Sequence, residues 1–297
     1  GVLLPSGADA TGTIAYYVSG NEENYVKLMN EKAQELNLSS THFSDTSGLD
    51  DQNNYSSVKD VSILLQYALK NEEFKKIFTS QEYLMSNGTV LKSTLVYYTE
   101  KFALDNKYIY GSKTGFTTIA GFCLASIAES NGVEYLLVTA KAPTTNQYPY
   151  HFADALKIYE YYGTHYQYQN IYKKEESLYF LDTLYSQEEK YEIKAVEDYS
   201  YYLPNDTNLD KISFQYEGID VVTPFTKKGK IGTLEVYLEN TLLKTIEVSY
   251  DGTLSLSIIR LFKEIPEIPI LIIIVVLSLL YVCFRKKKRK KRYKRKI

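Results

Sequence analysis

The sequence predicts an α+β domain with an antiparallel sheet, followed by a small all-β domain and one transmembrane helix. Three observations support this class. Apolar residues recur at helical spacing before about residue 80. Strand-like runs separated by turn signals follow after about residue 90, and an apolar run near the C-terminus precedes a cluster of bases. Because the helices come before the antiparallel strands instead of alternating with them, we expect an α+β domain.

Two helical segments carry start signals. Asn21 can cap a helix whose first turn holds Glu22 and Glu23, where carboxylates favour the positive end of the helix dipole. The segment from Ser57 to Asp60 resembles a capping box. We interpret the apolar stripes of both helices as ordinary core faces. The stripes are Val26, Met29, Ala33 and Leu36, and then Val61, Leu64, Leu65 and Ala68.

Strands should form the second half of the first domain. The first strand leads into Lys113-Thr114-Gly115. The next two should pair as a hairpin, because Asn131-Gly132 between them is a strong turn signal. A helix around residues 153–162 should close the domain. The predicted strands are residues 108–112, 122–128 and 133–140.

The all-β domain is predicted over residues 166–252. In one hairpin, apolar and polar residues alternate on both sides of a turn at Asn240, which is typical of a sheet with one solvated face. Its apolar residues are Leu234, Val236 and Leu238, and then Ile246, Val248 and Tyr250. The 30 tyrosines of the chain suit strands and domain rims, with a carbohydrate-binding platform as the alternative interpretation.

The apolar run covers residues 268–284, after a linker predicted over 253–267. As a helix it would span roughly 25 Å, and Arg285 and Lys286 can extend to the membrane surface to complete the ~30 Å hydrocarbon core. Flanking bases stay on the cytoplasmic side, so we expect the tail 285–297 inside and the body outside. The alternative, a buried core helix, is disfavoured by eleven bases in the last thirteen residues.

Charge excludes one class of partner. Without the eleven bases of the tail, 23 basic residues face 36 acidic ones, and the body carries about −13. Nucleic acid is therefore not an expected partner, because phosphate binding needs bases clustered on the folded surface. Cys123 and Cys283 suggest no disulfide framework, and three scattered histidines suggest no metal site. We expect no cofactor.

Two short motifs could carry chemistry. In Lys113-Thr114-Gly115 the ammonium and hydroxyl groups could hold a carboxylate, and glycine lets a substrate backbone approach closely. Ser6 follows proline before a helix, a position where serine is usually a helix cap. Taken alone, each motif is weak.

Their order along the chain is specific, and it resembles that of the D-alanyl-D-alanine carboxypeptidases, which are low-molecular-weight penicillin-binding proteins. Residues 1–165 resemble the later part of their penicillin-recognising domain, which has a β-lactamase/transpeptidase-like fold. Residues 221–234 resemble the β-rich domain that follows it. The segments are Pro5-Ser6-Gly7-Ala8-Asp9-Ala10, Leu38-Ser39-Ser40-Thr41-His42-Phe43, Gly48-Leu49-Asp50, Tyr55-Ser56-Ser57-Val58-Lys59-Asp60 and Gly111-Ser112-Lys113-Thr114-Gly115-Phe116-Thr117.

The resemblance implies a function and a site. Such enzymes use a serine nucleophile from an S-x-x-K motif to cleave the terminal D-Ala from peptidoglycan stem peptides ending in D-Ala-D-Ala, and β-lactams acylate the same serine. Ser6 would relay protons to the leaving amine, with electrostatic support from Lys113. Thr114 and Gly115 would bind the substrate, and the Phe116 N–H would form half of the oxyanion hole.

The chain departs from the family pattern in two ways. It has no S-x-x-K at a usable position, because the family places that motif well upstream of Ser6. We therefore expect the 297 residues to be an N-terminally truncated and inactive form. The second departure is Ala8, where the family usually has an asparagine that bonds the catalytic lysine and the substrate amide.

Two alternatives to the carboxypeptidase remain. Ala8 and the missing nucleophile would suit a membrane-anchored relative that binds peptidoglycan without catalysis. A β-lactamase-like hydrolase on the same fold is a third interpretation, although such an enzyme needs neither a β-rich domain nor a membrane anchor.

Overall fold

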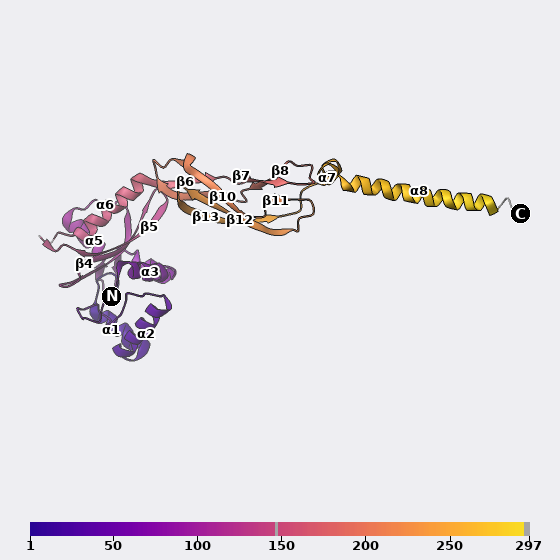
Figure 1. Cartoon of the computed structure of the whole chain (residues 1–297). Helices are drawn as coiled ribbons and strands as arrows, with labels where there is room; N and C mark the ends of the chain where they lie inside the picture. Colours follow the sequence, from indigo (N-terminus) through magenta and orange to yellow (C-terminus); the bar gives the residue numbers. More distant parts are fainter. Residues whose placement is uncertain (146–147, 294–297) are drawn as a thin grey trace. The chain divides into compact units, whose positions relative to one another are not determined.

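The computed structural model describes residues 1–145 and 148–293, with side chains as far as Lys286. Two compact units make up the chain, Gly1–Tyr166 and Gln167–Ile297 (Figure 1). The first unit contains the helices and one antiparallel sheet, as the sequence predicted, and the second is β-rich with a long C-terminal helix.

Local capping explains where the first helices begin. The Asn21 side chain accepts a hydrogen bond from the N–H of Asn24, and Ser57 Oγ accepts one from the N–H of Asp60, so both predicted starts are confirmed. The Asp60 carboxylate turns to the preceding loop, where it accepts from the Ser40 N–H. The helices of this unit are α1 (Ala8–Ser19), α2 (Glu22–Glu35), α3 (Val58–Ala68), α4 (Glu72–Phe78), α5 (Thr94–Phe102) and α6 (Tyr150–His165).

The main sheet of the first unit has the order β3-β4-β5, with β3 at one edge of the described sheet. Asn131 and Gly132 both have positive φ and join β4 to β5, as a two-residue hairpin turn requires. The predicted hairpin is therefore confirmed. The strands are β3 (Ile109–Thr117), β4 (Gly121–Ser130) and β5 (Val133–Ala142), and a separate hairpin is formed by β1 (Glu82–Leu84) and β2 (Val90–Lys92).

The prediction of a strand ending at Ser112 was wrong. Strand β3 continues through Lys113-Thr114-Gly115 to Thr117, because residues 112–117 pair in register with residues 121–126 of β4. The pairing supplies hydrogen bonds that outweigh the weak strand propensity of Lys113 and Gly115. These residues therefore lie on a rigid strand.

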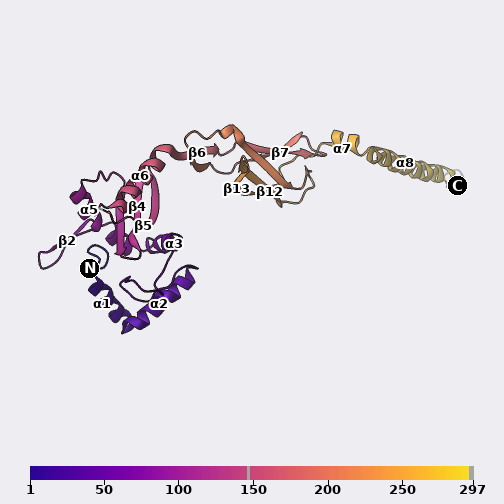
Figure 2. The ribbon, with the colours of Figure 1, turned by 60° about the vertical axis from the view of Figure 1, so that its left-hand side comes forward.

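Helices cover both faces of this sheet (Figures 1 and 2). Along β4, Leu124 and Ala128 are buried against Phe152 of α6, while Ile127 points the other way and packs with Leu65 of α3. This alternation is the two-residue period of a strand with two buried faces. On the α6 side, Ser126 Oγ and the Tyr159 hydroxyl share a buried 2.8 Å hydrogen bond.

The second unit contains the predicted β-strands over residues 166–250. In the hairpin of β12 and β13, Leu234, Val236, Val248 and Tyr250 are buried, which agrees with the predicted alternation. They pack with residues of β7, β8 and β11 in one core. The strands are β6 (Tyr166–Tyr172), β7 (Ser177–Thr183), β8 (Lys190–Lys194), β9 (Tyr199–Pro204), β10 (Ile212–Gly218), β11 (Val221–Val222), β12 (Gly229–Leu238) and β13 (Thr241–Tyr250).

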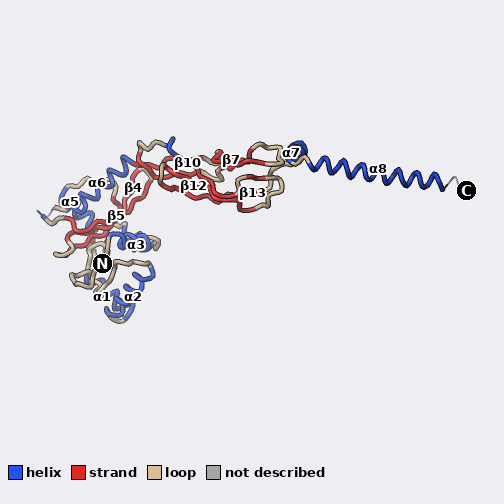
Figure 3. Tube along the Cα trace, viewed as in Figure 1, coloured by secondary structure: helices blue, strands red, loops and turns tan. Residues whose placement is uncertain are grey.

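The segment after β13 contains a short helix, α7 (Ile258–Glu264), within the stretch expected to be a linker. Helix α8 (Glu267–Tyr293) then continues as one unbroken helix (Figure 3). Its stretch Glu267–Lys286 has 20 residues, a mean hydropathy of 2.7 and no buried part. This length corresponds to about 30 Å, the thickness of a bilayer's hydrocarbon core. Residues 294–297 of the predicted tail lie outside the described residues.

Candidate active site

Ser6 and Lys113 meet although 107 positions separate them in the chain. Lys113 Nζ on β3 donates a 2.6 Å hydrogen bond to Ser6 Oγ. Ser6 has φ 58°, a left-handed conformation that is unfavourable for a residue with a side chain. The N-cap of α1 is Gly7, and no side chain caps this helix. The ordinary role of serine as a cap is thus excluded here, and the Ser6 hydroxyl faces the lysine instead.

Lys113 lies in a half-buried position. Burial lowers the pKa of its ammonium group below the ordinary value for lysine, because a partly desolvated charge is less stable. Its Nζ also donates to the Thr114 carbonyl oxygen. A lysine held at two points, with a lowered pKa, is suited to passing a proton to and from a neighbouring hydroxyl.

The next three residues of β3 follow the same edge. Thr114 Oγ1 donates to Thr94 Oγ1 at 3.2 Å, and Gly115 pairs with Cys123 across the β3–β4 ladder. Phe116 is exposed, with its ring centroid 4.8 Å from that of Phe122. The strand therefore brings Thr114, Gly115 and Phe116 to one edge beside Lys113.

Behind Phe116 lies an aromatic stack that the sequence did not indicate. The ring of Phe122 stacks on His151 at 4.6 Å, and burial lowers the pKa of His151 to about 4. The imidazole is therefore neutral at pH 7 and acts as a third aromatic ring. The rings of His151, Phe122 and Phe116 thus follow one another from α6 across β4 to β3.

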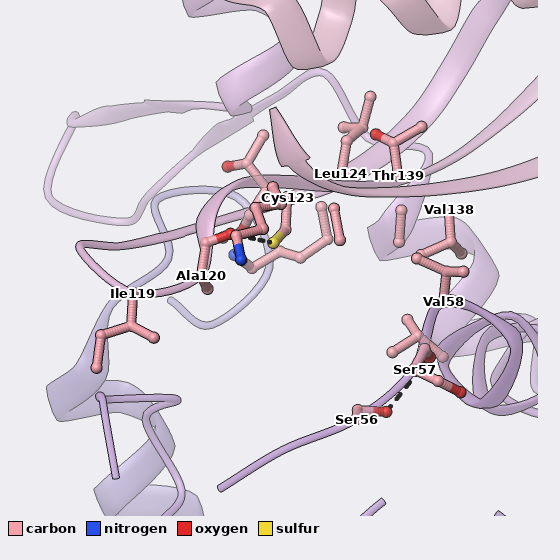
Figure 4. A pocket seen from close by; sticks show the side chains of 16 residues that line it. Ser56, Ser57, Val58, Ile119, Ala120, Cys123, Leu124, Val138 and Thr139 are labelled. Carbon is pink, nitrogen blue, oxygen red and sulfur yellow. Dashed lines mark hydrogen bonds between the residues drawn. The ribbon is translucent and has the colours of Figure 1, made fainter. Parts of the chain in front are cut away.

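Two pockets share Lys113. The larger, of about 520 Å³, lies between β3–β5 and the N-terminus of α3, with Ser56, Ser57 and Val58 on one side and Ile119 and Ala120 on another (Figure 4). The smaller, of about 310 Å³, is lined by Ser6, Ala8 and Lys113 together with residues of the loop before α3. The Ser6–Lys113 contact thus lies in a concave surface open to a ligand.

The loop 39–57 is ordered by side chains that sequence reasoning missed. Asn30 of α2 donates to the Phe43 carbonyl oxygen and accepts from the Phe43 N–H, at 2.8 and 2.9 Å. Asp45 Oδ1 accepts from the N–H groups of Ser47 and Gly48. The sequence Asp45-Thr46-Ser47-Gly48 is an Asx-turn signal that could have identified this turn.

Comparison with models of known protein families identifies the family of this chain. Residues 1–144 match the model of the D-alanyl-D-alanine carboxypeptidase family, and residues 166–255 match that of the penicillin-binding protein 5 C-terminal domain. Together the two matches span most of the chain. The chain belongs to the low-molecular-weight penicillin-binding protein family. This confirms the resemblance found in the sequence.

Similar proteins of known sequence are also D-alanyl-D-alanine carboxypeptidases. The chain is 27% identical over 244 residues to the D-alanyl-D-alanine carboxypeptidase DacF of Bacillus subtilis, covering 82% of this chain and 62% of the relative. It is 33% identical over 147 residues to DacA of Haemophilus influenzae, covering 48% of this chain and 36% of that protein. The chain thus spans less than two thirds of the length of either relative.

Solved structures confirm the predicted fold. Penicillin-binding protein 5 of Haemophilus influenzae superposes with a TM-score of 0.59 at 24% identity, covering 83% of this chain and 70% of that one. The carboxypeptidase DacD of Francisella tularensis gives a TM-score of 0.63 at 18% identity, covering 86% and 74%. At these identities the likeness concerns the fold.

One S-x-x-K motif occurs in the sequence, Ser56-Ser57-Val58-Lys59. Ser56 Oγ shares a 2.8 Å hydrogen bond with Thr41 Oγ1, and Ser57 caps α3. The Lys59 side chain is exposed, and within the described chain no hydrogen bond joins it to Ser56. This motif therefore forms the start of α3.

Ala8 lies beside the Ser6–Lys113 pair in the wall of the smaller pocket. It is the first residue of α1, and its carbonyl oxygen accepts a 2.7 Å hydrogen bond from Thr11 Oγ1. Its methyl group offers neither donor nor acceptor to a ligand. This part of the pocket wall is therefore apolar.

Asp60 supports the loop beside the site, and this predicts a pH effect on stability. The hydrogen bond from Thr41 Oγ1, at 2.8 Å, and that from the Ser40 N–H hold the pKa of Asp60 below its ordinary value. A carboxyl with a lowered folded-state pKa stabilises the fold above its unfolded pKa of about 3.9, and this stabilisation is lost as the pH falls through the folded value.

We therefore expect Asp60→Asn to be less stable than the wild type at pH 7, with a difference that shrinks as the pH falls below about 4. Urea unfolding midpoints measured across this pH range would test it. Asp105→Asn, at an exposed carboxylate paired only with Lys107 in the described chain, is the matched control. A constant difference between Asp60→Asn and the wild type at all pH values would contradict the assignment.

Proposed function

We propose that the chain forms the proton-relay and substrate-binding side of a serine-type D-alanyl-D-alanine carboxypeptidase that acts on peptidoglycan stem peptides. The observation that carries the proposal is the 2.6 Å hydrogen bond from Lys113 Nζ to Ser6 Oγ, at an open pocket of a penicillin-binding protein. Its residues are catalytic Ser6 and Lys113, with Thr114, Gly115 and Phe116 binding the substrate.

In the proposed reaction, the nucleophile is the serine of an S-x-x-K motif, which family members carry well upstream of the position of Ser6. Its hydroxyl gives its proton to the lysine of the same S-x-x-K motif as its oxygen bonds to the carbonyl carbon of the penultimate D-Ala. The C–N bond then breaks, and the leaving amine of the terminal D-Ala takes a proton from Ser6 Oγ. Lys113 restores that proton through the hydrogen bond to Ser6. Water later cleaves the ester and releases the shortened stem.

The β3 edge supplies the binding groups. The Thr114 hydroxyl, beside the positive charge of Lys113, suits the terminal carboxylate of the substrate. Gly115 has no side chain to hinder close approach of the substrate backbone. The Phe116 N–H would donate to the developing oxyanion, where one donor is typically worth ~10²–10³ in rate. β-Lactams would be held by the same groups.

A mass measurement tests this function directly. The protein extracted from its native membrane is incubated with benzylpenicillin, and its intact mass is compared with that of a sample treated with the ring-opened penicilloic acid. We expect the mass to increase by one penicillin only with the intact β-lactam, because acylation opens the ring and adds the whole molecule. An unchanged mass would overturn the enzymatic proposal.

Ala8 favours one second function, a relative that binds peptidoglycan without catalysis. The methyl group replaces an amide that would hold both the catalytic lysine and the substrate. In that case stem peptides would still bind and protect the protein from unfolding, while no penicillin adduct would form. The mass measurement and a thermal shift with a D-Ala-D-Ala peptide therefore separate the two functions.

We also propose that α8 anchors the protein in the cell membrane. The stretch Glu267–Lys286 is long and apolar enough to cross a bilayer, and the bases from Arg285 onward support a cytoplasmic tail with the body on the outer side. This location would place the body beside the peptidoglycan.

A further inference from the structure

One loop of the second unit exposes an aromatic side chain next to two bases. In the loop 223–228, Phe225 is 66% exposed, and Lys227 and Lys228 follow it at the surface. The loop is fixed from within, because the Thr223 N–H donates to Thr226 Oγ1 at 2.8 Å and the Phe225 N–H donates to Thr223 Oγ1 at 3.1 Å. Exposed Phe225 is thus held by a defined turn.

Helix α7 is joined to the same end of the unit. Tyr185 links them: its ring lies 6.4 Å from that of Phe225, its carbonyl oxygen accepts from the Ser257 N–H, and its N–H donates to Glu264 Oε2. Arg260 of α7 also pairs with Glu189 at 3.1 Å. These contacts engage Glu189, which faces α7, and Glu264, which is the last residue of α7.

The first residues of α7 are apolar and exposed. Ile259 is 82% exposed and Ile258 is also exposed, although both are among the most apolar side chains. The short helix therefore presents two isoleucines to its surroundings, at the same end of the unit as Phe225.

Chain continuity brings this end close to the anchor. Helix α7 ends at Glu264 and α8 begins at Glu267, so only Ile265 and Pro266 separate them. The three Cα steps from Glu264 to Glu267 span at most about 11 Å, and the seven residues of α7 add about 10 Å. If α8 crosses the membrane, Ile258 and Ile259 lie within reach of the lipid surface.

We propose that Phe225 and the exposed isoleucines of α7 form a second lipid contact, which holds the end of the β-rich unit in the interfacial layer of the membrane. Apolar side chains of such segments enter about 5–10 Å into the boundary between headgroups and acyl chains. Lys227 and Lys228 are placed to bind lipid phosphates, while the Phe225 ring enters the membrane between the lipid headgroups. This inference rests on the proposed anchor.

The chain contains no tryptophan, so one substitution introduces a unique fluorescent reporter. Four variants of the full chain are placed in vesicles of phosphatidylglycerol and phosphatidylcholine, with or without bromine atoms on the acyl chains of the phosphatidylcholine. Phe225→Trp and Ile259→Trp report on the proposed contact, and Leu277→Trp reports on insertion of α8.

Val196→Trp is the matched control. Val196 is 78% exposed in the same unit, beyond the end of the β7–β8 hairpin at which Ser177 pairs with Lys194. Tyr185 follows the other end of β7, at Thr183. The six residues from Ser177 to Thr183 place the two ends of the strand about 20 Å apart.

We expect brominated lipid to remove most of the emission of Phe225→Trp, Ile259→Trp and Leu277→Trp, and to leave that of Val196→Trp unchanged. Phe225→Trp and Ile259→Trp should also emit at shorter wavelength in vesicles than in a reference sample without vesicles or detergent that contains an excess of the soluble headgroup. Quenching of Leu277→Trp without quenching of Phe225→Trp would overturn the second contact and leave the anchor intact. An unquenched Leu277→Trp would overturn the anchor, and the second contact with it.

Discussion

Replacing Lys113 with alanine in the protein extracted from its native membrane is expected to abolish the proposed acylation by penicillin. The substitution removes the donor that holds Ser6 Oγ at 2.6 Å and the positive charge beside the edge of β3 proposed to bind the substrate carboxylate. Positioned proton transfer contributes about 10²–10⁴ in rate. The rate of labelling by a fluorescent penicillin should therefore fall by at least about 10²-fold.

Two variants sharpen this test. Lys107→Ala removes an exposed lysine that pairs with Asp105, and it should label at the wild-type rate. Lys113→Arg keeps the charge but not the ability to lose a proton, so it should recover substrate attraction without the relay. Acylation of Lys113→Ala at the wild-type rate would show that the site is assigned to the wrong residues.

The second large effect concerns location. Deleting residues 268–297 is expected to move the protein from the membrane pellet to the supernatant, because it removes nearly all of the apolar stretch Glu267–Lys286. A lipid contact through Phe225 and α7 alone would be weak and reversible. Sedimentation of lysates in high salt provides the measurement.

Deleting only residues 287–297 is the control for this experiment. It keeps the apolar stretch and removes most of the basic tail, so the protein should stay in the pellet. If the protein without residues 268–297 also remained in the pellet at high salt, another anchor would exist, and α8 would not be what holds the protein.

Features that depend on neighbouring residues were predictable from the sequence. The caps at Asn21 and Ser57 and the turn at Asn131-Gly132 each depend on a few adjacent side chains and backbone angles. The alternation around Leu234 follows from the two-residue period of a strand. These features were found without reference to the rest of the chain.

Features that depend on tertiary contacts were not predictable in the same way. The pairing of Ser6 with Lys113 joins residues 107 positions apart, and only the family resemblance suggested it. The length of β3 depends on its pairing with β4, which overrides the local tendency of Gly115 to end a strand. The Asp60 carboxylate also bonds Ser40 and Thr41 of a distant loop, so the capping-box pattern indicated the hydrogen bond to Ser57 and missed these two.

The position of β3 at the edge of the sheet has a consequence for solubility. In the described part of the chain, β4 is its paired neighbour in this sheet, and the Gln81 side chain bonds the Tyr110 carbonyl oxygen, which leaves the rest of the outer side open to a strand from a second copy. A lysine on an edge strand opposes such self-association, because two copies would bring like charges together. Lys113 would therefore protect the protein from aggregation at the same edge that is proposed to bind the substrate. The Lys113→Ala variant should accordingly be assayed as a monomer fraction from size exclusion.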